Sequence, residues 1–85
     1  MKTFDYTIRD ELGIHARPAG RLVKEAGGFT SSVKIAKGEK SADAKKIFGV
    51  MGLGAKCGDT VTLTIEGEDE ADAAAKLEAL MQAIW

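Results

Sequence analysis

The spacing of apolar side chains changes several times along this chain, and this changing period constrains the fold more than any other feature. In KTFDYTIR (residues 2–9) apolar residues alternate with mostly polar ones, which predicts a half-buried strand. From Ala16 the period becomes that of a helix, which ends at Gly27-Gly28. The apolar stripe of this predicted helix is Ala19, Leu22, Val23 and Ala26.

The two periods continue to alternate through the rest of the chain. Residues 29–36 predict a second strand, a turn at 37–39 leads to a short strand at 40–42, and DTVTLTIE (59–66) predicts a fourth strand. A short helix is predicted within residues 43–53, and a longer one follows Asp69, a candidate N-cap, to the C-terminus. The apolar stripe of that last helix is Leu77, Leu80, Met81 and Ile84.

The order strand, helix, strand, strand, short helix, strand, helix predicts an α+β fold. One mostly antiparallel four-stranded sheet with three helices packed on one face buries every apolar stripe and leaves the other face in water. With 85 residues, 45% of them apolar and 29% charged, we expect a single globular domain over residues 1–85.

Composition excludes several classes of protein. The single cysteine, Cys57, excludes an intrachain disulfide and a multi-cysteine metal site, and is typical of a reducing cytoplasm. We expect no signal peptide and no membrane insertion, because no apolar run is long enough. The net charge of −1 argues against general nucleic-acid binding, and only 6% of the residues are aromatic. The basic first half either favours an acidic partner or is an ordinary mixed surface.

The segment GIHARPAG (residues 13–20) contains the only histidine and the only proline of the chain. If a helix begins at Ala16, His15 is its N-cap residue and the proline lies harmlessly in the first turn. The free N–H groups of Ala16 and Arg17, the helix dipole and the Arg17 guanidinium then form an anion site beside the imidazole. We expect Gly13 to allow a sharp turn and Ile14 to anchor the loop inward.

These surroundings suggest a chemical role for His15. Positive neighbours disfavour imidazolium, so the ring is expected to be a neutral nucleophile that can hold a labile phosphoryl group on a nitrogen. No metal is needed, since phosphoryl transfer depends mostly on positioning and electrostatics. The alternative is a partly exposed loop histidine that caps the helix weakly. A metal site has no second histidine, and Cys57 is predicted to be an ordinary small residue in a separate loop.

GIHARPAG resembles the active-site signature of HPr, the family of histidine-containing phosphocarriers of the bacterial sugar phosphotransferase system. The similarity includes KGEKSADAKKIFGVMGLGAKCGD and DTVTLTIEGEDE, and so extends over nearly the whole chain. The resemblance implies an open-faced β-sandwich of four antiparallel strands backed by three helices. It also implies a monomeric, cytoplasmic carrier without a cofactor, which is phosphorylated stoichiometrically and is not itself an enzyme.

The resemblance further implies partners and site residues. His15 would accept a phosphoryl group from enzyme I, which took it from phosphoenolpyruvate, and pass it to sugar-specific enzyme II (IIA) proteins. Arg17 would be its charge partner, and the phosphate would bind at Ala16, Arg17 and Pro18. The expected docking residues are Gly20, Lys24, Ile47, Phe48 and Met51. Helical spacing also allows Ile47, Val50 and Leu53 to be core, which leaves Phe48 and Met51 as the exposed pair.

Two positions depart from the family pattern. Lys46 replaces the serine that a regulatory kinase phosphorylates in many members, so this switch should be absent or relocated. Leu12 replaces a small polar residue near the histidine, and either loosens the loop or widens the docking surface. A regulatory docking module that does not serve sugar transport therefore remains a second hypothesis.

Overall fold

Four antiparallel strands form one sheet in the computed structural model, which describes residues 1–13 and 15–85. The expectation that Ile14 anchors the loop concerns a residue outside this description. The spatial order is β1-β4-β2-β3, so that β4, the last strand in sequence, pairs with both β1 and β2. The strands are β1 (Lys2–Thr7), β2 (Ser32–Lys37), β3 (Lys40–Asp43) and β4 (Thr60–Glu66).

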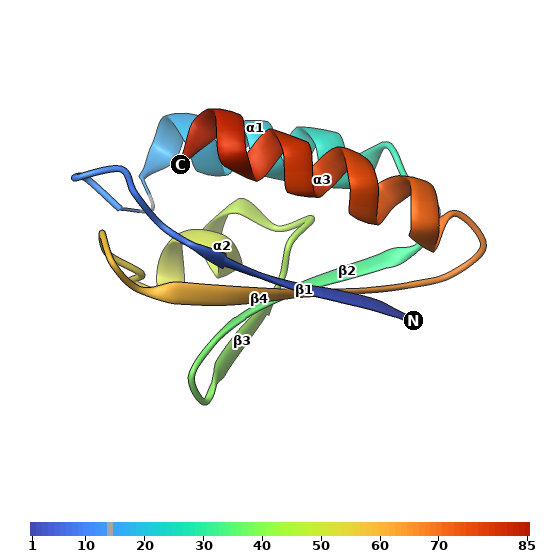
Figure 1. Cartoon of the computed structure of the whole chain (residues 1–85), viewed down its shortest axis with the longest axis horizontal. Coiled ribbons are helices and arrows are strands. Elements are labelled where there is room, and N and C mark those ends of the chain that lie inside the picture. Colours follow the sequence, from blue (N-terminus) through green and yellow to red (C-terminus); the bar gives the residue numbers. More distant parts are fainter. Residues whose placement is uncertain (14) are drawn as a thin grey trace.

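Three helices complete the fold and cover one face of the sheet (Figure 1). Helices α1 and α3 lie side by side above the strands, and the short α2 contacts both α1 and β3. Their bounds are α1 (Ala16–Gly27), α2 (Ile47–Gly52) and α3 (Glu70–Ile84). This arrangement confirms the predicted α+β architecture. Among the described residues, no helix is both long enough and apolar enough to span a lipid bilayer.

The core lies between the sheet and the helices, as the alternating patterns predict. In β4 every second side chain is fully buried, namely Val61, Leu63 and Ile65. Leu77 and Met81 of α3 belong to the same buried cluster. Each wholly buried Val, Leu, Ile or Met stabilises the fold by about 1.5–3 kcal/mol relative to an exposed one, so this layer is the main source of stability.

Strand β2 starts at Ser32, three residues later than predicted. The backbone N–H groups of Thr30 and Ser31 donate to the side chain of Asp69, each at 2.9 Å. These donors are therefore unavailable to a sheet ladder. Asp69 does occupy the N-cap position of α3 as predicted, but its carboxylate makes no capping bond to that helix. Its side chain ties the segment before β2 to the start of α3 instead.

Helix α2 is shorter than the predicted 43–53. Asp43 remains in β3, where it pairs with Lys34, and its Oδ1 accepts the N–H of Lys45 at 2.9 Å. The N–H of Lys46 donates to the Asp43 carbonyl at 3.0 Å, which closes a turn before the helix. Sheet pairing thus delays the helix until Ile47. Strand β1 is also shorter than predicted, since it ends at Thr7 and not at residue 9.

Candidate functional site

His15 occupies the N-cap position of α1, as predicted, with an extended backbone (φ −137°, ψ 176°). Its carbonyl accepts the first helical hydrogen bond, from Ala19 N–H at 3.0 Å. Helix geometry leaves the N–H groups of Ala16 and Arg17 without an intrahelical acceptor, and Pro18 has no N–H to satisfy. The His15 side chain is 34% exposed and makes no capping hydrogen bond within the described residues. The ring is therefore partly accessible, and its side chain does not serve as a hydrogen-bonding cap of α1.

The nearest charged partner of His15 is Asp10, which the sequence analysis did not select. Asp10 Oδ2 lies 3.3 Å from His15 Nε2, while Oδ1 accepts the N–H of Leu12 at 2.8 Å. The Leu12 N–H, and after it the hydrogen bond to His15, hold the pKa of the Asp10 carboxyl below its usual range. An aspartate that starts a turn and accepts the N–H two residues on is a common local motif. This motif could have drawn attention to Asp10 in the sequence. It does not reveal that Asp10 Oδ2 faces the histidine.

Gly13 closes the turn that begins at Asp10. Its φ is +66°, a left-handed conformation that favours glycine, and an added Cβ would lie 2.5 Å from the Ala55 carbonyl oxygen. The Gly13 N–H donates to the Asp10 carbonyl at 2.9 Å. The prediction of a sharp turn at Gly13 is confirmed, and close approach to the segment at Ala55 adds a second reason for glycine.

A pocket of about 180 Å³ opens at the His15 ring. Arg17 and Arg21 lie one turn apart on α1, so that both line it, and Ile84 of α3 contributes an apolar side chain. Arg21 follows Arg17 by four residues, which places both on the same face of a helix, so the sequence could have identified Arg21 as a second site residue. The complete lining is Asp10, His15, Arg17, Pro18, Arg21 and Ile84. The lining therefore includes a carboxylate, Asp10, in addition to the positive groups that the sequence analysis expected near His15.

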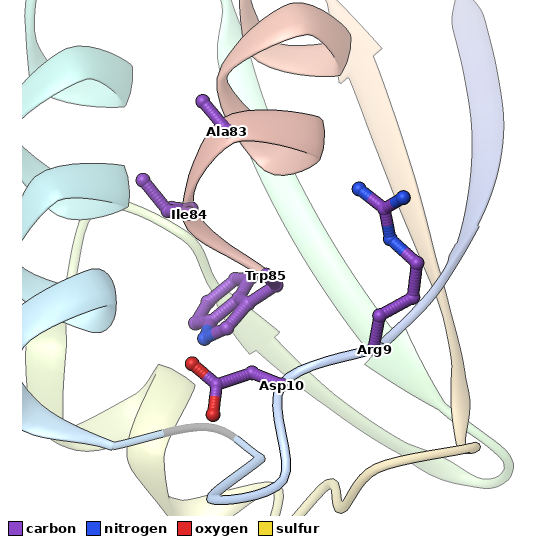
Figure 2. A pocket seen from close by; sticks show the side chains of 5 residues that line it. All are labelled: Arg9, Asp10, Ala83, Ile84 and Trp85. Atoms are coloured by element: carbon purple, nitrogen blue, oxygen red, sulfur yellow. The ribbon is translucent and has the colours of Figure 1, made fainter.

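A second hollow, of about 330 Å³, shares Asp10 and Ile84 with this pocket. Figure 2 shows the side chains that line this second hollow. Arg9 lines its far side and is held there by hydrogen bonds to the Gln82 carbonyl (3.0 Å) and the Tyr6 hydroxyl (3.2 Å). Trp85 also lines this hollow, and its buried indole Nε1 has no hydrogen-bond partner among the described residues. Figure 2 shows this nitrogen on the edge of the ring that is turned toward the Asp10 carboxyl group.

The predicted docking residues lie on α1 and α2, which contact each other. A Cβ at Gly20 would lie 3.9 Å from Ile47 Cδ1, so the two helices approach closely at that point. Phe48 is 87% exposed and Met51 is 38% exposed, as expected from their spacing, whereas Ile47 is half-buried. The expectation that Val50 and Leu53 belong to the core is confirmed.

The structure also places the remaining residues that the sequence analysis discussed. Lys24 is exposed in the last turn of α1, and Leu12 is exposed in the loop before the histidine. Lys46 occupies the N-cap position of α2 without a capping side-chain bond. Cys57 is exposed, with Sγ 3.6 Å from the Arg9 carbonyl. In the part of the chain that the structure describes, no three His, Cys, Asp or Glu side chains form a group that could hold a metal ion.

Comparison with known proteins yields one consistent family. Residues 2–83 match the family model described as "PTS HPr component phosphorylation site". The phosphocarrier protein HPr of Lysinibacillus sphaericus is 49% identical over 81 residues, which are 95% of this chain and 92% of that protein. The solved histidine-containing phosphocarrier protein of a Mycoplasma is 35% identical, with a TM-score of 0.93 over 98% of this chain and 97% of that one. Crh of Bacillus subtilis, a catabolite repression protein, is 44% identical over 92% of this chain and 90% of that chain, with a TM-score of 0.78.

Proposed function

The chain belongs to the HPr family of phosphocarrier proteins of the phosphotransferase system, and we propose that it accepts a phosphoryl group on His15 from enzyme I and passes it to sugar-specific enzyme II (IIA) proteins. The observation that carries this proposal is the accessible His15 ring at the N-terminus of α1, in a pocket that two arginines share. In this proposal the chain is a stoichiometric carrier and not an enzyme.

The ring nitrogen that would carry the phosphoryl group is Nδ1. The other nitrogen, Nε2, faces the Asp10 carboxylate at 3.3 Å and is occupied by that contact. In the transfer, the Nδ1 lone pair forms a bond to phosphorus while the bond between phosphorus and the donor atom breaks, and its electron pair stays with the donor. The second transfer reverses this: the acceptor atom bonds to phosphorus and the P–N electron pair returns to Nδ1.

Several groups near His15 favour a dianionic phosphoryl group. The first-turn N–H groups of Ala16 and Arg17 carry the positive end of the α1 dipole, which attracts anions. The guanidinium groups of Arg17 and Arg21 add two positive charges to the same pocket and can form charge-assisted hydrogen bonds to phosphate oxygens. Because these groups are placed before the phosphoryl group arrives, they stabilise it without a metal ion on this chain.

We assign partner docking to the surface beside the pocket. Phe48 and Met51 of α2 present exposed apolar side chains, and Gly20 of α1 lets the two helices come close together. Lys24 adds positive charge near the end of α1 and can steer an acidic partner. A small apolar patch of this kind suits a complex that forms and dissociates quickly, as a carrier with two successive partners requires.

The decisive experiment is phosphorylation in solution. The purified protein is incubated with enzyme I and phosphoenolpyruvate, and its intact mass is measured before and after acid treatment. We expect the mass of one phosphoryl group to be gained and then lost in acid, as a P–N bond requires. Absence of the gain in the native chain, or its persistence in His15→Ala, would refute the proposal.

The similarity to Crh gives a second candidate function, a regulatory docking module that plays no part in sugar transport. Lys46 and Leu12 motivate it, because both depart from the pattern of the family. The presence of His15 in an accessible pocket favours the carrier. Expression in a strain that lacks its own phosphocarrier distinguishes the two: restored sugar uptake excludes the docking module, and unrestored uptake despite phosphorylation in vitro supports it.

A further inference from the structure

We infer that Asp10 is a positioning residue for phosphoryl transfer, which holds the neutral His15 ring in the tautomer with its hydrogen on Nε2. This inference rests on the proposed function, because it explains how Nδ1 is kept as the nucleophile. The Asp10 carboxylate touches neither the phosphoryl group nor a partner in this account. It acts only through the histidine.

The first support is the chemistry of the contact. A carboxylate only accepts hydrogen bonds, so the nitrogen that faces it in a neutral imidazole is the one that bears hydrogen. Asp10 Oδ2 faces Nε2 at 3.3 Å, and both side chains are about one-third exposed. The lone pair of the neutral ring is then on Nδ1, which is the form that can attack phosphorus.

The second support is that the carboxylate is itself held in place. Asp10 Oδ1 accepts the N–H of Leu12 at 2.8 Å, and the Asp10 carbonyl accepts the N–H of Gly13 at 2.9 Å. Gly13 in turn lies so close to Ala55 that no side chain fits there. The pKa of Asp10 is lowered by the Leu12 N–H and by the histidine, which keeps the carboxylate ionised at neutral pH. A fixed acceptor orients the ring better than a mobile one.

Replacement by asparagine separates this role from simple charge pairing. In Asp10→Asn the side-chain oxygen can still accept the Leu12 N–H, while the amide NH₂ takes the place of Oδ2. An NH₂ group donates, so it favours the tautomer in which Nε2 accepts and Nδ1 bears the hydrogen. In a serine-protease triad, the same substitution of an aspartate beside a histidine selects the wrong tautomer with little change in geometry.

The first measurement is the ¹⁵N NMR spectrum of the His15 ring at a pH where it is neutral. We expect the native chain to show the tautomer with hydrogen on Nε2 and Asp10→Asn to shift toward hydrogen on Nδ1. Phosphorylation of Asp10→Asn by enzyme I should be about 10-fold slower in kcat, the factor that corresponds to one charge-assisted hydrogen bond. KM should not change, because the docking helices are untouched.

The matched control is Asp43→Asn. Asp43 also accepts the N–H two residues on, from Lys45 at 2.9 Å, and its replacement changes the net charge equally. This variant should keep the native tautomer and the native kcat.

A native His15 ring with hydrogen mainly on Nδ1, or with no preference, would overturn the inference without any variant. An Asp10→Asn protein with native tautomer and kcat would also overturn it. Failure of the native chain to accept a phosphoryl group would refute the proposed function, and the tautomer spectrum would then decide the role of Asp10 separately.

Discussion

Ser31 and Asp69 lie 38 positions apart in the chain and are joined by two hydrogen bonds to the same carboxylate oxygen. The backbone N–H of Ser31 donates to Asp69 Oδ1 at 2.9 Å, and the buried Ser31 hydroxyl donates to it as well. These bonds connect the start of β2 to the start of α3. The Ser31 hydroxyl first, and then the Thr30 N–H, lower the pKa of Asp69 from 3.8 to about 2.

The low pKa of Asp69 predicts a pH-dependent contribution to stability. Because the folded state favours the carboxylate, the contribution is complete above the ordinary pKa of 3.8 and is lost as the pH falls toward about 2. Urea unfolding at a series of pH values should show that Asp69→Asn removes part of the acid dependence of the native chain. Ser31→Ala should cost about 1–2 kcal/mol at neutral pH. An acid profile of Asp69→Asn that matches the native one would contradict this assignment.

The loop before His15 is predicted to depend on glycine at position 13. Gly13→Ala should destabilise the protein by about 2–4 kcal/mol, because φ is +66° and the new Cβ would strike the Ala55 carbonyl. Phosphorylation should also slow, since the loop carries Asp10. Gly27→Ala is the control: a Cβ added there meets no atom within 4 Å beyond its chain neighbours and the local helix backbone, and the change should stabilise α1 by about 0.5–1 kcal/mol. Thermal unfolding measures both, and equal effects of the two changes would exclude steric locking at Gly13.

Arg17 and Arg21 are predicted to act on the phosphoryl group and Lys24 only on docking. Arg17→Ala or Arg21→Ala should lower kcat for phosphorylation by on the order of 10²-fold, because each removes a charged donor from the pocket. Lys24→Ala removes a positive charge from the same helix outside that pocket, so it should raise KM and leave kcat unchanged. Steady-state kinetics with enzyme I separates the two effects. If Arg21→Ala altered KM alone, this arginine would belong to the docking surface.

Phe48 and Val50 lie on the same short helix but should respond differently to truncation. Phe48→Ala should leave the free energy of unfolding within about 0.5 kcal/mol of native, because the ring is 87% exposed. It should raise the KM for enzyme I by about 10-fold through loss of an aromatic anchor. Val50→Ala, at a fully buried position, should cost about 2 kcal/mol without changing KM. A native KM in Phe48→Ala would remove this residue from the docking surface.

Most secondary-structure elements were predictable because their signals are local. Alternation in 59–66 and the helical stripe that contains Leu77 and Met81 specify which face of each element is buried, and the structure buries those faces. The N-cap position of His15 was predictable for the same reason, since the change of period at Ala16 marks where the helix begins. The wrong boundaries at β2 and α2 arise where Asp69 and Asp43 bond to backbone groups in ways that the hydrophobic pattern does not encode.

The sequence by itself determined the order of the elements, the histidine at a helix start and the resemblance to a phosphocarrier. All three follow from neighbouring residues or from a contiguous motif. Only the tertiary structure decided that Asp10 and Ile84 also lie at the His15 ring. Asp10 reaches it because the loop folds back at Gly13, and Ile84 reaches it because α3 packs beside α1. Such contacts depend on how the loop folds and how the helices pack on one core. The spacing of residues along the chain does not specify either of these.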